Sequence, residues 1–201
     1  MYMNLKEIVE PNHTALLVWD VQNLLVNGIF NKEEFLKDLK SLIEIARGKN
    51  IPIIYSKIVP LPKDYESSFR TFMFMKRFKI KDPEKLPRFL EPGTPGSEIP
   101  SEVAPLDTDI IIEKSTASIF IGTNFEYLMR NKGIDTILFT GISTEFGVAS
   151  SARDSCNRGF YTVIVKDCVS SFNQKMHEMT LEILKTMCLI EPSQNIIKEW
   201  E

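Results

Sequence analysis

The stretch whose residues most clearly suggest a reactive site is Asp135–Gly147. Its apolar run ends at Gly141, and a helix-like segment follows. Thr144 stands where an N-cap is expected. A strand that turns sharply into a helix aims backbone N–H groups and the positive end of the helix dipole at one point. That point suits a phosphate, a carboxylate or a developing oxyanion. Gly147 occupies the first helical turn and offers no nucleophilic side chain there.

Two ionisable residues stand at the ends of other apolar runs. Asp20 ends the run 14–20, and Lys114 follows the run 109–113. Ligands of open α/β sheets bind outside the carboxyl ends of the strands. A partly desolvated Asp20 could act as general acid or base, and a lysine beside it could stabilise its charge. On spacing alone, a loop carboxylate and a solvated strand-end lysine are the simpler explanations.

The strands and helices that would position these residues are indicated by the pattern of apolar residues along the chain. Short apolar runs alternate with amphipathic segments of helical length. Strands are predicted at 14–20, 51–58, 109–113, 136–140, 162–165 and 188–190, and helices at 32–49, 120–132, 144–157 and 175–187. Continuous apolar strands separated by helices predict a parallel sheet covered on both faces.

The stretch 59–105 differs from the rest because it is rich in proline and has little periodicity. Its segment Phe69–Phe78 combines Phe and Met with Arg and Lys. A loop this long in an α/β domain is usually functional or forms an interface. We expect a lid over the site, a subunit contact, or both.

Length and charge restrict the class of protein. The 201 residues, 43% hydrophobic and 25% charged, predict one globular domain spanning 1–201. The formal net charge of −3 argues against a nucleic-acid partner. Neither a signal-peptide pattern nor an apolar run long enough for a bilayer is present, so we expect no membrane partner and a cytoplasmic location.

The cysteines and histidines do not form a recognisable site. Cys156, Cys168 and Cys188 have no paired spacing, so neither a disulfide framework nor a zinc ribbon is predicted. Cys156 falls on the opposite side of the predicted helix from Gly147. His13 and His177 are not at a ligand spacing, so we predict no metal and no cofactor.

Several short motifs in order resemble the isochorismatase-like hydrolases, also called the cysteine hydrolase family, which includes nicotinamidases. They are Asp20-Val21-Gln22, Pro92-Gly93-Thr94-Pro95-Gly96, Lys114 with Ser118 after it, the turn from Gly141 to Gly147, Ala152-Arg153-Asp154 and Arg158-Gly159. Together they cover nearly the whole chain. The resemblance implies a three-layer Rossmann-like fold with a six-stranded parallel sheet in the order 3-2-1-4-5-6. It also implies a homodimer or homotetramer.

The resemblance also assigns roles to individual residues. Asp20 and Lys114 match two members of the family's Asp–Lys–Cys triad, and Gly147 matches the third. Gln22, Ile142 and Ser143 match positions of the oxyanion or substrate-binding region, where the family often has a non-proline cis peptide bond. For Gln22, a purely structural hydrogen bond is an equally good explanation. The chain departs from the family in lacking the nucleophile and the metal-binding histidines.

True isochorismatases resemble this chain in lacking the cysteine. They hydrolyse a vinyl ether, in which an Asp protonates carbon and water captures the oxocarbenium ion. We therefore predict a metal-independent hydrolase of a small organic substrate. Two alternatives remain open: a non-catalytic small-molecule binder or assembly protein with a degenerate site, and an amidase whose nucleophile comes from elsewhere in the chain. Glu145 stands where those enzymes have a histidine, which disfavours an anionic substrate unless Glu145 points to solvent.

Overall fold

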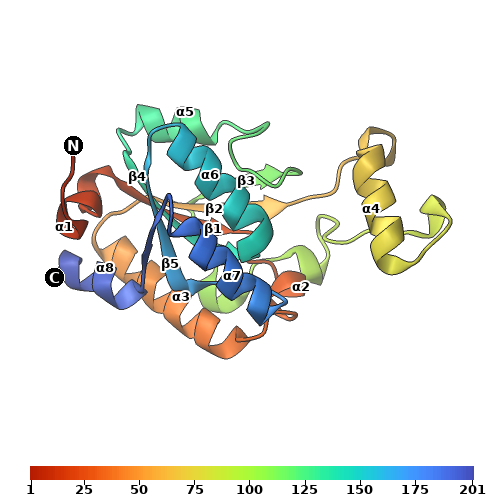
Figure 1. Cartoon of the computed structure of the whole chain (residues 1–201), viewed down its shortest axis with the longest axis horizontal. Helices are drawn as coiled ribbons and strands as arrows, with labels where there is room; N and C mark the ends of the chain where they lie inside the picture. The colour runs from red at the N-terminus through yellow and green to blue at the C-terminus, as the bar shows by residue number, and fades with distance from the viewer.

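A six-stranded sheet forms the centre of the computed structural model, which describes residues 1–201 (Figure 1). The strands are β1 (Thr14–Trp19), β2 (Ile53–Ile58), β3 (Ile110–Lys114), β4 (Thr136–Ile142), β5 (Tyr161–Ser170) and β6 (Leu189–Glu191). Their order is β3-β2-β1-β4-β5-β6. Every neighbouring pair is parallel. The predicted fold class and strand order are confirmed.

Helices cover both faces of the sheet (Figure 1). One face carries α1 (Leu5–Ile8), α3 (Lys32–Gly48) and α8 (Ser193–Trp200), and the other carries α5 (Phe125–Asn131), α6 (Ala149–Asn157) and α7 (Gln174–Leu184). The short α2 (Asn23–Val26) follows β1, and α4 (Ser68–Phe78) projects from the body. None of the helices has the length and apolar composition that crossing a bilayer requires.

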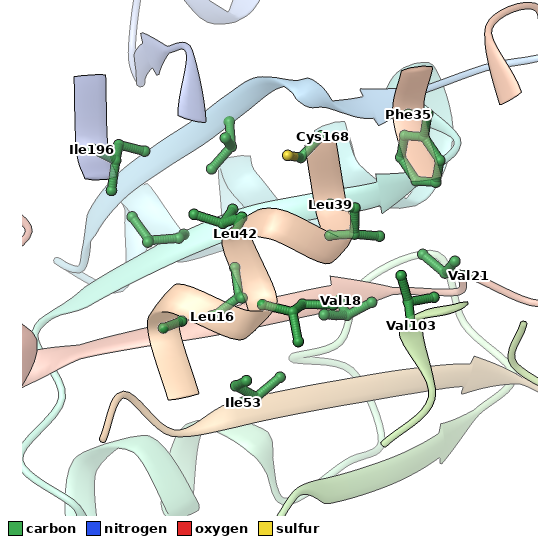
Figure 2. Close-up of a cluster of buried hydrophobic side chains, with 14 of the residues drawn as sticks. Leu16, Val18, Val21, Phe35, Leu39, Leu42, Ile53, Val103, Cys168 and Ile196 are labelled. Carbon is green, nitrogen blue, oxygen red and sulfur yellow. The ribbon is translucent and has the colours of Figure 1, made fainter. Parts of the chain in front are cut away.

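Two apolar clusters lie on the two sides of the sheet because successive strand residues point to opposite faces. In β1, Leu16 and Val18 belong to one cluster, and Leu17 and Trp19 belong to the other. Figure 2 shows the first cluster, in which side chains of α3 such as Leu39 pack onto the strands. All residues of β1 are therefore buried, which explains its continuous apolar sequence.

Several elements differ from the prediction. The helix predicted at 120–132 begins only at Phe125, because in the preceding turn the Phe120 amide donates to the Ser118 hydroxyl and the Thr123 hydroxyl donates to Ile119 O. β5 extends to Ser170, well past the predicted end, alongside a register shift in β4. The unpredicted α8 starts at Ser193, whose amide and hydroxyl both donate to Asp167.

The aromatic segment forms the unpredicted α4, which begins after Ser67, whose hydroxyl accepts from the Arg70 amide. No residue of α4 is buried. It stands away from the sheet in Figure 1. The expected roles, a lid, a subunit contact or both, stay predictions. Arg70 contacts the body by donating to Ser115 O at 3.0 Å.

Candidate active site

Asp20 and Lys114 form a buried ion pair although 94 residues separate them. Lys114 Nζ donates to Asp20 Oδ2 at 2.7 Å, and the side chains are 1% and 5% exposed, lysine first. Lys114 ends β3 and Asp20 follows β1, so the lysine spans the intervening β2, roughly 9–10 Å at two strand spacings. The predicted juxtaposition of the two side chains is present.

Ser56 of β2 supplies the remaining contacts of the Asp20 carboxylate. Its hydroxyl donates to Asp20 Oδ1 at 2.6 Å and accepts from the Asp20 amide at 3.1 Å. Asp20 has φ +47°, in the left-handed region that Asp tolerates better than bulky residues. The carboxyl group is thus held between a serine and a lysine at the point where β1 ends.

Burial controls the protonation of this pair. It raises the pKa of Asp20, against the opposing effects of the Lys114 charge and the Lys114 and Ser56 hydrogen bonds. It also lowers the pKa of Lys114, against the attraction of Asp20. Both shifts favour neutral partners, because a low dielectric disfavours charge. A proton transfer to or from Asp20 therefore costs less here than it would for a solvated ion pair.

Trp19 fills the space beside Gly147. A Cβ built on Gly147 would lie 2.0 Å from Trp19 Nε1 and 2.4 Å from Cε2. Lys114 Nζ lies 3.8 Å from the centroid of the Trp19 ring, a cation–π contact. The indole, 1% exposed, thus lies between the start of the helix and the ion pair. The Trp19 indole fills the volume that a cysteine side chain at position 147 would occupy.

The sequence analysis missed Trp19. The available signal was an aromatic residue at the end of an otherwise aliphatic strand, directly before Asp20. Gly141 is adjacent for a related reason: with φ +110°, its absent Cβ would lie 2.0 Å from the Trp19 carbonyl oxygen. Glycine at 141 therefore lets β4 pass close to β1 beside the site.

The Gln22 side chain makes its hydrogen bonds to backbone groups. Its Nε2 donates to Ser97 O at 3.0 Å and Ile58 O at 3.3 Å, and its Oε1 accepts from the Ile58 amide at 2.9 Å. The side chain is fully buried, and both of its amide donors are engaged. Of the two roles considered, the structure favours the structural one, in which Gln22 ties the loop at Ser97 to β2.

Ile142 ends β4 and Ser143 precedes the helical turn Thr144–Val148 that leads into α6, and both residues are buried. The Ile142–Ser143 peptide bond is cis, as predicted. Ser143 takes the N-cap position that was expected for Thr144, so that expectation was wrong by one residue. The Phe146 and Val148 amides both donate to Ser143 O at 3.3 Å, so these two amides point inward to the turn.

Thr144 and Glu145 face β5, on the opposite side of β4 from Asp20. The Thr144 hydroxyl donates to Ser170 O at 3.1 Å and lies 2.8 Å from Nδ1 of the buried His177. Glu145 Oε1 accepts from Ser171 Oγ at 2.7 Å. Glu145 is half-buried and does not point to solvent, so the condition for an anionic substrate is not met; its carboxylate lies beside β5 and makes no contact with the Asp20 carboxyl.

The cysteines lie apart from the ion pair. Cys168 is buried against α3 (Figure 2), where burial raises its pKa. Cys156 is nine residues beyond Gly147, about 14 Å along a helix. Cys188 lies beside Cys156, with 3.5 Å between their Sγ atoms. No His, Cys, Asp and Glu side chains gather in groups of three or more that could hold a metal ion.

A buried acid and base at the carboxyl ends of parallel strands, beside a helix N-terminus, define an α/β small-molecule site. Comparison with known proteins identifies the family to which this site belongs. Residues 14–191 match the isochorismatase domain. The chain therefore belongs to the isochorismatase family, whose members are hydrolases.

Individual relatives agree with this assignment. The chain is 31% identical over 166 residues to the uncharacterized isochorismatase family protein YwoC of Bacillus subtilis, covering 75% of this chain and 87% of that protein. It is 27% identical over 176 residues to the ureidoacrylate amidohydrolase RutB of Agrobacterium fabrum, covering 79% and 76%. The structure of an isochorismatase-like hydrolase from Alkaliphilus metalliredigens superposes with a TM-score of 0.78 at 24% identity, covering 94% and 99%, and supports the fold.

Proposed function

We propose that this protein hydrolyses a small organic substrate without a metal and without a covalent thiol intermediate, using Asp20 as a general acid. The observation that carries the proposal is the buried Asp20–Lys114 pair, in which burial raises the pKa of the acid. A thioester route from position 147 is closed because Gly147 has no side chain and Trp19 fills its space.

A vinyl ether is the substrate class that suits these groups. The Asp20 carboxyl donates its proton to the terminal vinyl carbon, and the C=C electron pair forms the new C–H bond. The resulting oxocarbenium ion is captured by water, which returns a proton to the Asp20 carboxylate. The hemiketal then separates into a ketone and an alcohol. Lys114 stabilises the carboxylate during the cationic stage, because its Nζ already contacts Oδ2 at 2.7 Å.

A second candidate is a non-catalytic small-molecule binder, and one observation favours it. The ion pair is almost fully buried, and the Trp19 indole occupies the space that a side chain at position 147 would need. The amidohydrolases among the relatives suggest a third candidate, an amidase with its nucleophile elsewhere. All three cysteines are distant from Asp20 or enclosed in the core, which counts against it.

Turnover by a cysteine-free protein separates the three candidates. We expect the variant Cys156→Ser/Cys168→Ala/Cys188→Ser to hydrolyse isochorismate or a simpler vinyl ether within about threefold of the unmodified protein, since no thiol participates. Product release would be followed by liquid chromatography, with a panel of carboxamides run in parallel. Amide turnover that disappears with the cysteines would support the amidase. Saturable binding without any product would support the binder.

We also propose that the 201 residues form one domain that assembles as a homodimer or homotetramer through α4. Phe69 and Phe72 of this helix are 70% and 50% exposed, and Met73, Tyr65 and Phe78 extend the apolar surface. Apolar side chains gathered on a projecting helix usually mark an interaction site. A second copy of the same chain would cover them.

Charge introduced into α4 should therefore dissociate the assembly. We expect Phe69→Glu/Phe72→Glu to have the mass of one chain by light scattering at micromolar concentration, and the native protein to have twice or four times that mass. Tyr127→Glu is the matched control, because Tyr127 is 69% exposed on α5, away from α4. A native protein that is already monomeric would refute the proposal.

A further inference from the structure

Cys156 and Cys188 form a thiol pair at the end of the sheet where the strands begin, whereas Asp20 lies at the end where they finish. Their Sγ atoms are 3.5 Å apart, although the residues are 32 positions apart in sequence. Cys156 lies in the last turn of α6, and Cys188 lies in the bend before β6. Both line a surface groove of about 520 Å³ with Tyr161, at the amino end of β5. The spacing in sequence concealed this pair, and the fold creates it.

The two thiols have different surroundings. Cys156 is half-buried and open to the groove, whereas Cys188 is buried at 8% exposure. A hydrogen bond from the Cys188 thiol lowers the pKa of Cys156 to about 6, and the same contact with burial raises the pKa of Cys188. When protonated, Cys156 lies within 3.2 Å of Met187 O and can donate to it. Cys156 is thus the more accessible of the two thiols, and Cys188 is the buried thiol beside it.

We propose that Cys156 and Cys188 form a peroxide-responsive dithiol that closes into a reversible disulfide. The Cys156 thiolate attacks one oxygen of hydrogen peroxide, the O–O bond breaks, and sulfenic acid and hydroxide form. The Cys188 sulfur then attacks the sulfenic sulfur, forming the S–S bond and releasing water. Two thiols lose two electrons and two protons, and one peroxide becomes two waters. A reactive thiol with a resolving thiol beside it is the usual arrangement of redox-sensing cysteines.

The local structure allows this bond to form. A disulfide has S–S near 2.0 Å, so the two sulfurs must approach by about 1.5 Å. Cys188 stands in a bend between α7 and β6, outside the strand pairing, where its amide donates to Leu184 O at 2.8 Å. The bond would join the end of α6 to this bend. Because α6 continues from the turn that holds Gly147, the disulfide would brace the helix that packs on Trp19.

Treatment of the reduced protein with one equivalent of hydrogen peroxide tests the proposal. We expect the mass to fall by about 2 Da, the peptide map to show Cys156 linked to Cys188, and dithiothreitol to reverse both. The melting temperature should rise by about 5–10 °C on oxidation. None of these readouts depends on hydrolase activity, so the inference stands or falls separately from the proposed function.

Three single variants assign the roles. In Cys188→Ser, dimedone should trap a sulfenic acid at Cys156, because the resolving thiol is absent. In Cys156→Ser, peroxide should leave Cys188 reduced. The matched control Cys168→Ala should form the disulfide as the unmodified protein does, because Cys168 lies in the other cluster against α3. Peroxide that leaves Cys156 and Cys188 reduced in the native protein, or that oxidises Cys168 faster, would overturn the proposal.

Discussion

Asp20→Asn is expected to lower the turnover number by about 10²–10⁴-fold, the usual contribution of general acid–base catalysis. The amide has nearly the shape of the carboxylic acid but cannot donate its proton to carbon and recover it from water. Ser56 can still hydrogen-bond to the amide oxygen, so the side chain should keep its place. The measurement is kcat with saturating substrate, together with a thermal unfolding curve.

A control is needed because the substitution also removes a buried charge. Breaking a buried ion pair from one side costs about 3–5 kcal/mol, which deprotonation of Lys114 would reduce. Asp109→Asn is the matched variant: Asp109 is paired with Arg47 at 2.6 Å, and its side chain is also 5% exposed. It should lose stability but keep kcat. Full activity in Asp20→Asn, or equal loss in both variants, would contradict the role of Asp20.

The same carboxyl determines the expected pH dependence. Burial raises the pKa of Asp20 above 3.8, so the protonated form persists to higher pH than in a solvated aspartic acid. Since that form is the active one, kcat/KM should be constant below the raised pKa. Above it, kcat/KM should fall about tenfold per pH unit. A rate that instead increases with pH would mean that Asp20 acts as a base.

The largest effect on the free energy of unfolding is expected from substitutions at Trp19 and Gly147, whose side-chain volumes compete for the same space. Gly147→Cys alone should be destabilising by about 1–3 kcal/mol or more, because its Cβ would overlap the Trp19 indole. Trp19→Val alone should cost about 3–5 kcal/mol through the cavity it leaves. In Trp19→Val/Gly147→Cys, the smaller valine removes the overlap and the cysteine side chain fills part of the cavity. The free energy of unfolding should therefore exceed the additive expectation by at least about 1 kcal/mol.

The double variant should also have a reactive thiol. A cysteine at the start of this helix, near Lys114, has the positive surroundings that lower a thiol pKa. Iodoacetamide should therefore alkylate the thiol introduced by Gly147→Cys faster than Cys168, as followed by mass spectrometry. Leu17→Val/Gly147→Cys is the matched control, because Leu17 lies on the same face of β1 and its loss leaves Trp19 in place. Additive energies in the Trp19 cycle would mean that Trp19 is not what excludes a side chain at 147.

Much of the fold could be predicted from local patterns. The apolar runs at 14–20 and 136–140 are buried on both faces, and α3 buries one side at helical spacing. These periodicities involve only residues close together in sequence, so they can be recognised without knowing how the rest of the chain folds. Asp20 and Lys114 were predicted to meet because they match two members of the family's triad; strand-end position placed each at the carboxyl end of a strand but did not by itself pair them.

Only the tertiary structure decided what those residues meet. Trp19 could equally have been an ordinary core aromatic, and its contact with Gly147 depends on how α6 packs against β1. The pairing of Cys156 with Cys188 likewise requires the end of α6 to meet the bend before β6. Contacts between side chains distant in sequence depend on rotamers and on close packing of the whole core, and local periodicity contains no information about either.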